Sequence, residues 1–252
     1  MSGSKSENAS FVYHFELADK SIRIGVWQDA MGRIVGVDTG GETQVEPELI
    51  ALETEQCVHC PLHGTDSPAC PLAAVVCPVV ARFAHLDSHT PARVVVHSST
   101  RDYHVDTSVQ QGLRSLLGLL MGGSSCPHMT FFRPMARYHL PFSDESETLF
   151  RAVTNFAMAS YLLSRREGRA APDLILLQDI YQKIKVLNQG VSGRLRLMSD
   201  SDATSNAIVL LDLFAKYLGS YLDEGLEAVG ALYADFLQGQ ADNPPEQGRS
   251  KP

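Results

Sequence analysis

The sequence predicts an α+β protein, in which a small antiparallel β-sheet region with a cysteine-rich loop is followed by a helical bundle. Short runs before residue 107 alternate apolar and polar side chains, which is typical of half-buried strands. After residue 107 the apolar side chains recur at helical spacing, which indicates amphipathic helices. A run rich in cysteine, proline and glycine interrupts the first region and predicts a loop.

The strands are expected in two hairpins. Residues 11–17 and 21–27 alternate on either side of a short turn and predict the first hairpin, and a third strand follows at 33–38. Residues 92–97 and 101–106 predict the second hairpin. Between the hairpins, 46–56 is expected to be a short helix or irregular, and the apolar run 72–86 to be helical.

Four helices are expected in the second region. Thr107 and Gln110 have the spacing of a capping box, and the helix that they start should stop at Gly122-Gly123. Further helices are expected from near Ser143, after Pro172, and from near Asp202 towards Leu237. The chain therefore divides into a disordered N-terminus at 1–10, a β-rich region with the cysteine loop at 11–106, a helical bundle at 107–238, and a disordered tail at 239–252.

Composition narrows the classes of function. The net charge is −8, and an acidic surface argues against nucleic acid as a partner. Residues 1–10 lack the apolar core of a signal peptide, and no apolar run is long enough to span a membrane. We therefore expect a cytoplasmic protein, in which disulfides rarely persist and clustered cysteines favour metal binding or catalysis.

The cysteine-rich loop is the first candidate site. Cys57 and Cys60 have C-x-x-C spacing, and Cys70 follows within the same loop. A tight turn brings two such thiolates to one side of a metal ion. A fourth ligand is expected at Cys126 or His128, from the segment between two helices. Zinc is the expected metal, with an iron–sulfur cluster as the alternative.

Two other interpretations of these cysteines remain open. Cys57 and Cys60 could form a thiol–disulfide redox pair, although the residues after Cys60 indicate a loop, whereas redox dithiols usually start a helix. The cysteines could also be unrelated free thiols. Cys77 lies on the expected helix and is interpreted as a small buried residue.

A second candidate site lies in the connector after Cys126. Arg133 and Arg137 are one helical turn apart, and His139 follows them. Two guanidinium groups on one side could bind the phosphate or carboxylate of an anionic small molecule, and His139 could donate a proton. The alternative is that both arginines pair with acidic residues of the helical bundle.

These segments resemble those of an uncharacterised bacterial protein family. Its members carry Q-C-x-x-C-P-L, matched by Gln56–Leu62, and C-P-H, matched by Cys126–His128. They also carry F-x-R-P-M-A-R-x-H-L-P-F, matched here around Arg133, Arg137 and His139. The resemblance covers most of residues 10–238 and implies kinship without an assigned activity.

We therefore expect a metal-binding protein with a structural zinc or iron–sulfur centre and a binding or regulatory role. The alternatives are an enzyme or sensor that binds an anionic small molecule, and a redox protein that uses Cys57 and Cys60. The sequence leaves open whether the protein is an enzyme, which protein or small molecule is its partner, and its oligomeric state.

Overall fold

A computed structural model describes residues 9–64, 66–168, 170, 173–198, 206, 208–209, 212, 227 and 229–242. Its centre is a five-stranded antiparallel sheet with strand order β3-β2-β1-β4-β5. The strands are β1 (Phe11–Glu16), β2 (Ser21–Gln28), β3 (Ile34–Asp38), β4 (Pro91–Ser98) and β5 (Asp102–Ser108). The two expected hairpins are therefore joined edge to edge by the pairing of β1 with β4.

One face of the sheet carries the core. Alternation turns Phe11, Tyr13 and Phe15 of β1 inward, where each is buried. The helix α3 (Val109–Gly123) lies on this face, and an added side-chain atom at its Gly112 would stand 2.5 Å from the Phe15 ring. The sheet and α3 are thus in direct contact.

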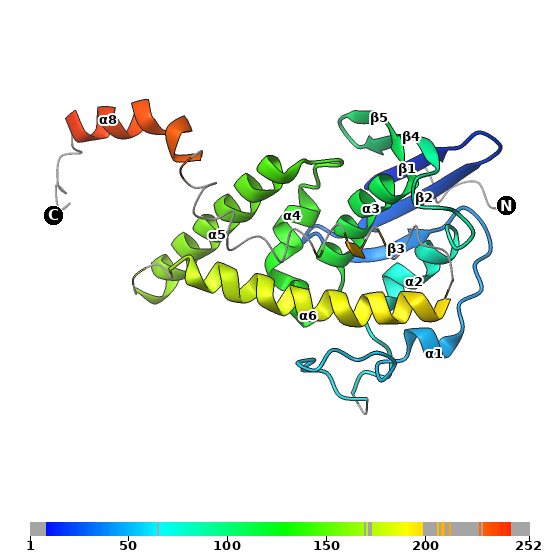
Figure 1. Ribbon diagram of the computed structural model, residues 1–252. Coiled ribbons are helices and arrows are strands. Elements are labelled where there is room, and N and C mark those ends of the chain that lie inside the picture. The colour runs from blue at the N-terminus through cyan, green and yellow to red at the C-terminus, as the bar shows by residue number, and fades with distance from the viewer. Residues whose placement is uncertain are drawn as a thin grey trace.

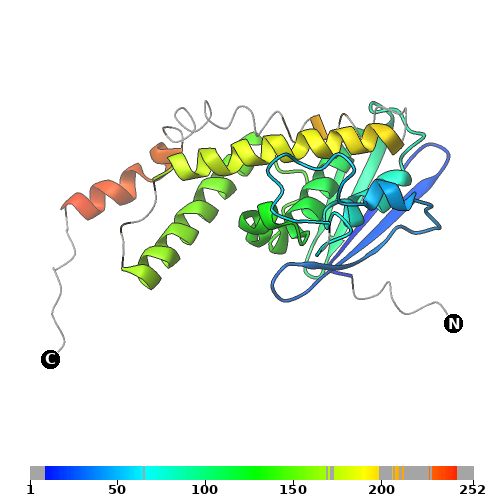
Figure 2. The same cartoon turned by 90° about the horizontal axis from the view of Figure 1, so that it is seen from below.

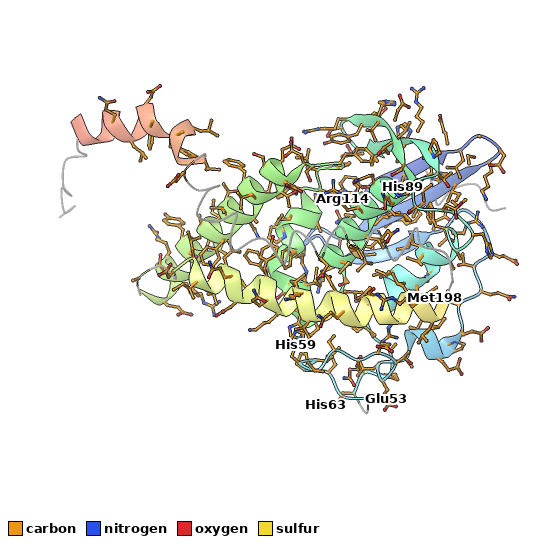
Figure 3. All side chains as sticks on the ribbon, in the orientation of Figure 1. Glu53, His59, His63, His89, Arg114 and Met198 are labelled. Carbon is orange, nitrogen blue, oxygen red and sulfur yellow. The ribbon has the colours of Figure 1, made fainter. Side chains whose placement is uncertain are left out.

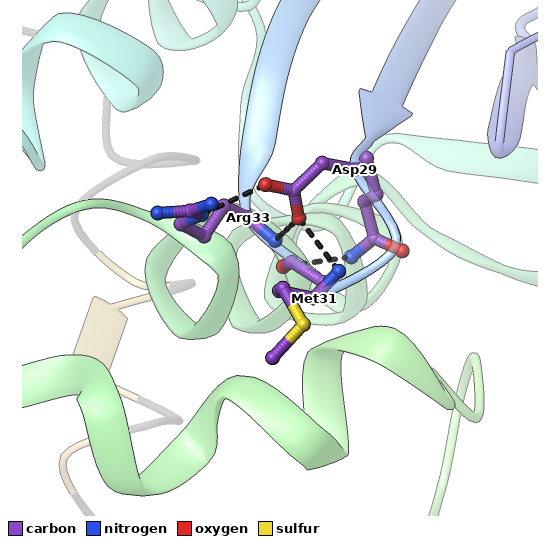
Figure 4. A network of polar contacts seen from close by, with 5 residues as sticks. Asp29, Met31 and Arg33 are labelled. Carbon is purple, nitrogen blue, oxygen red and sulfur yellow. Dashed lines mark hydrogen bonds and ion pairs between the residues drawn. The ribbon is translucent and has the colours of Figure 1, made fainter.

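The turn between β2 and β3 is closed by one side chain (Figure 4). Oδ1 of Asp29 accepts hydrogen bonds from the backbone N–H groups of Met31 and Arg33, each at 2.9 Å, and Oδ2 pairs with Nε of Arg33 at 2.8 Å. Gly32 takes a φ of 79° there, which a residue without a Cβ adopts at little cost. The short helix α4 (Arg133–Arg137) packs against this turn.

Other helices extend beyond the sheet (Figures 1 and 2). The long helix α6 (Ile175–Met198) runs past α4 and α2 (Ala73–Ala81) in both views, whereas α8 (Ala234–Asp242) stands apart from the sheet. Further helices among the described residues are α1 (Pro47–Ile50), η1 (Pro127–Phe132, a 3-10 helix) and α5 (Glu145–Glu167).

The expected fold class is confirmed, since the sheet is antiparallel and the helices are largely separate from it along the chain. A single hydrophobic core joins the two regions, because buried residues of the strands and of α2, α3, α5 and α6 form one cluster. No helix in the described ranges is long and apolar enough to cross a membrane.

At two places the structure differs from the expected secondary structure. The capping box at Thr107 is wrong, because β5 continues through Ser108, which is the N-cap of α3 and makes no side-chain cap bond. At the other end, α8 includes residues 239–242, which the sequence assigned to a disordered tail. Residues 1–8 and 243–252, and most of the helix expected from Asp202, lie outside the described residues.

Candidate metal centre

The cysteine loop is closed at its base by backbone hydrogen bonds. Ala51 and Ala69 form an isolated antiparallel bridge, and the N–H of Cys70 donates to the carbonyl of Ile50 at 2.8 Å. Cys57 and Cys60 lie within this closed loop, on a turn in which the N–H of Cys60 donates to the Cys57 carbonyl at 2.9 Å. Closure therefore returns Cys70 to the start of the loop, beside α2.

All five cysteines line one cavity. Cys57 and Cys60 come from the loop, Cys70 precedes α2, Cys77 lies on α2, and Cys126 precedes η1. The cavity has a volume of about 30 Å³, enough for about two water molecules. Apart from the cysteines, its walls are mainly apolar side chains of the loop, α2 and α6, including those of Leu52, Leu72, Val76, Leu187, Val191 and Leu195.

Helix α6 approaches the loop closely because it carries glycine at two facing positions. A Cβ at Gly190 would stand 2.8 Å from the carbonyl oxygen of Glu55, and one at Gly193 would meet the Glu55 side chain at 2.5 Å. Glu55 itself has a φ of 47°, in the left-handed region that non-glycine residues seldom adopt. The strained residue and the two glycines together place Cys57 against α6.

Arg194 of α6 lines the same cavity. The residue is only 3% exposed. Its nitrogens donate to the backbone carbonyls of Leu49, Ala51 and Thr54, at the base of the cysteine loop. Within the described residues no carboxylate pairs with it, so a buried positive charge stands beside the cysteines.

A histidine pair ties the cysteine loop to η1. The rings of His59 and His128 are in contact, with centroids 4.1 Å apart and planes tilted by 31°, and Nε2 of His128 donates to the His59 carbonyl at 3.0 Å. His59 lies on the loop beneath α6, whereas His63 is farther out (Figure 3) and exposed. Cys126 lines the cavity and His128 does not, so the two candidates for a fourth ligand occupy different positions.

In this arrangement the thiols of Cys57, Cys77 and Cys126 are held in their neutral form. Burial raises the pKa of Cys57, and the neighbouring Cys60 raises it further. Burial also raises the pKa of Cys77 and of Cys126 to about 11. No group of three His, Cys, Asp or Glu side chains among the described residues stands ready to hold a metal ion. A metal would have to draw the sulfur atoms together, and its own charge would stabilise the thiolates.

The second candidate set is divided by the fold. Arg133 and Arg137 lie on α4, as their spacing predicts. Arg137 is exposed, with its guanidinium carbon 5.7 Å from the centre of the Tyr138 ring. His139 instead faces the core, where its Nε2 lies 2.6 Å from the hydroxyl of Tyr13. No described contact joins the histidine to either arginine.

The environment of His139 also sets its charge. Burial, together with the positive charge of Arg151, lowers its pKa to about 3. The imidazole is therefore neutral at neutral pH, and Nε2 can accept a hydrogen bond from Tyr13. Tyr13 in turn lies 2.8 Å from the Ser115 hydroxyl, which accepts from the N–H of Phe142. This chain of bonds gives His139 a packing role inside the core.

The sequence interpretation missed Gly190, Gly193 and Arg194. The sequence does contain a signal for Arg194. The buried stripe of α6 through Leu187, Val191 and Leu195 also includes this charged residue, which breaks the apolar pattern. A buried arginine on an otherwise apolar helix face needs acceptors from another segment. That pattern could have indicated a backbone partner, although not which one.

Comparison with known proteins adds one match. The model of a family described as a domain of unknown function, DUF6901, matches residues 12–234, a range that contains every candidate residue above. No curated protein and no solved structure matches the chain.

Proposed function

Because the chain belongs to DUF6901, a family of unknown function, we propose from its site alone that it is a metal-binding protein with a structural zinc centre. The ligands are the thiolates of Cys57, Cys60, Cys70 and Cys126. The centre serves a binding or regulatory role in a cytoplasmic protein, where cysteines stay reduced and available to a metal.

The convergence of four cysteines from three segments carries this proposal. Cys57 and Cys60 belong to the loop, Cys70 to the lead into α2, and Cys126 to the lead into η1, yet all four line one cavity. If the cysteines were unrelated free thiols, nothing would require Cys126, 56 residues beyond Cys70 in the chain, to lie beside the cysteines of the loop. A closed set of four protein ligands is typical of structural rather than catalytic zinc.

The buried charge of Arg194 supports the same conclusion. Burying a cation without a counter-charge is costly, even when carbonyl groups satisfy its hydrogen bonds. Four thiolates around one Zn²⁺ carry a net negative charge, and Arg194 lines their cavity. Metal binding would thus supply the anionic partner that the guanidinium group otherwise lacks among the described residues.

The size of the cavity favours zinc over an iron–sulfur cluster. A volume of about 30 Å³ matches a single ion whose ligands are the surrounding sulfurs. A cluster adds several iron and sulfide atoms to the same space, and the walls formed by Leu187, Val191 and Leu195 would have to move outward.

The metal would act as a clamp between distant parts of the chain. It would bind the cysteine loop to α2 on one side and to η1 on the other, next to the contacting rings of His59 and His128. Because such a site is absent from the unfolded chain, the binding energy of the metal contributes directly to folding. The clamped loop is then a rigid surface that could bind a partner.

Metal content tests this proposal. Protein purified with a reductant and without chelators should contain one zinc per chain by mass spectrometry, and should be colourless. Cobalt substituted for zinc should give the absorption of a tetrahedral thiolate site. Cys57→Ser and Cys126→Ser should each lower zinc affinity at least about tenfold. Purified protein with neither zinc nor iron above background would contradict the proposal.

Two matched variants identify the ligands. Cys77→Ala removes a thiol from the same cavity and should retain the metal, because Cys77 is assigned to packing on α2. His128→Ala should also retain it. If His128→Ala loses zinc while Cys126→Ser keeps it, the fourth ligand is His128. If the purified protein is brown and contains iron and sulfide, the centre is an iron–sulfur cluster and not a zinc site.

The two alternative functions have less support from the geometry. A redox pair at Cys57 and Cys60 lacks the helix N-terminus that lowers a thiol pKa, since both residues lie on a loop and burial raises the pKa of Cys57. An anion site at Arg133, Arg137 and His139 lacks the contribution of His139, which faces Tyr13. Metal-free protein with a reversible Cys57–Cys60 disulfide would revive the redox interpretation.

A further inference from the structure

Helix α5 carries two apolar stripes on opposite sides. Its buried side consists of Leu149, Ala152, Phe156 and Ser160. At 3.6 residues per turn, Met158 and Leu162 lie about half a turn away from that side. They are 59% and 58% exposed. Tyr161 and Phe150 flank them and are exposed as well.

This second stripe is unusual for a surface helix. The outer face of such a helix is normally polar, and single exposed apolar residues need no explanation. Here, however, Phe150, Met158 and Leu162 lie on one row of the helix at multiples of four residues, with Thr154 between the first two. This row is the apolar ridge of α5. The C-terminal end of α5 projects away from the sheet in both views (Figures 1 and 2).

The charges of α5 indicate what covers the ridge. Its first turn is acidic, with Glu145 and Glu147, and its last turn is basic, with Arg165 and Arg166. A second α5 that runs antiparallel would bring each acidic end against a basic end. In the register that sets Glu147 opposite Arg165, Phe150 faces Leu162 and Thr154 faces Met158 of the other copy. One two-fold arrangement therefore matches both the charges and the apolar side chains.

We propose that the protein forms a two-fold symmetric dimer through the outer face of α5, with a second copy of the chain as the partner. An isologous interface requires a self-complementary surface, and an α5 with opposite charges at its ends and an apolar centre has that property. The proposed dimer does not depend on the metal centre, because the residues of its interface lie on α5, which does not contribute a cysteine to the cavity.

The size of the helix predicts the strength of the dimer. Its 23 residues span about 35 Å, so one helix pair buries less area than the roughly 800 Å² per partner of a standard interface. We therefore expect a dimer that dissociates on dilution rather than a permanent one.

Light scattering coupled to size exclusion tests the dimer. Wild-type protein should approach twice the chain mass of 27.5 kDa at high concentration. Met158→Glu with Leu162→Glu should remain at the monomer mass. Ile175→Glu with Leu197→Glu is the matched control: it places the same two charges at exposed apolar residues of α6 and should dimerise like the wild type. A wild-type protein that stays monomeric at high concentration would overturn the proposal.

Charge reversal supplies a second, independent readout that does not introduce charge into the apolar ridge. Arg165→Glu with Arg166→Glu sets acidic ends against acidic ends, so its dimer should be at least tenfold weaker at low salt. Salt screens surface charges, so added salt should weaken the wild-type dimer and strengthen the charge-reversed one. Equal dimerisation of both proteins at low salt would rule out the antiparallel α5 interface.

Discussion

The side chain of His139 shows how one residue links the fold to pH. Its Nε2 meets the hydroxyl of Tyr13, which is completely buried, and its ring lies edge-on to Phe11 with centroids 5.4 Å apart. Protonation of the ring would place a positive charge beside Arg151 and remove the acceptor for Tyr13. The fold therefore tolerates only the neutral imidazole.

Stability should consequently fall in mild acid. The folded pKa of His139 is about 3, below the ordinary value of 6.5, so the unfolded chain binds the extra proton first. This contribution is fully present above pH 6.5 and is lost as the pH falls from 6.5 towards 3. Because His139 is partly exposed, we expect a slope of about 1 kcal/mol per pH unit, below the limit of about 1.4.

Denaturant unfolding between pH 7.5 and 4 measures this effect in the wild type and in His139→Gln, which does not titrate. The difference in unfolding free energy between the two proteins should shrink as the pH falls through this window. Parallel curves would show that His139 is already solvated in the folded state.

The positions of single residues could be predicted from the sequence only where local structure determines them. The spacing of Cys57, Cys60 and Cys70 indicates a shared loop because local turn chemistry places them. The positions of Arg194 and His139 could not be inferred, because each is defined by a partner far away in the chain: the Thr54 carbonyl and the Tyr13 hydroxyl.

At the scale of elements, the packing of α3 on the sheet depends on glycine. A methyl group at Gly112 would meet the Phe15 ring at 2.5 Å and Val94 at 3.0 Å, whereas one at Gly118 would have nothing within 4 Å. Both residues are interior to the same helix. They form a matched pair in which one position is crowded and the other is open.

Alanine at these two positions should have opposite effects. Gly112→Ala should lower the unfolding free energy by about 1–3 kcal/mol, since Phe15 is fully buried and cannot move away without strain. Gly118→Ala should raise it by up to about 1 kcal/mol, because alanine favours the helix and meets no obstacle. Urea denaturation of both variants checks this. Equal effects of the two substitutions would mean that α3 does not pack on β1 as described.

Element boundaries were predictable where local chemistry alone decides them. The start of α5 follows its acidic residues, because Asp144 and Glu147 form a capping box. The start of α3 did not follow Thr107, because pairing with β4 extends β5 through Ser108. Competition between a strand partner and a cap cannot be inferred from the residues around the junction.

On the scale of the whole molecule, the alternation pattern predicts strands but not their partners. Nothing in β1 or β4 indicates that they pair, because about eighty residues separate them in the chain. This pairing joins the two hairpins into one sheet, and α3 then covers it, so that strands and helices share one core. The division at residue 106 is therefore a change of secondary structure within one continuous core.

A shared core predicts that the two regions unfold together. The single tryptophan, Trp27 on β2, packs over Gly25 and Gly36 of neighbouring sheet positions, so its fluorescence reports the sheet. Far-ultraviolet circular dichroism at the helical minimum reports mainly the helices. Thermal midpoints from the two signals should coincide, as expected of a single cooperative unit. Removal of zinc by a chelator should lower both midpoints together, because the proposed centre would clamp segments of both regions. Bound zinc would stabilise the folded chain by about 4 kcal/mol when free zinc exceeds its dissociation constant a thousandfold. If the tryptophan signal changes at a different temperature from the helical signal, the regions before and after residue 106 are independent units. If the midpoints coincide but do not change when the chelator is added, the shared core is confirmed and the structural role of the metal is ruled out.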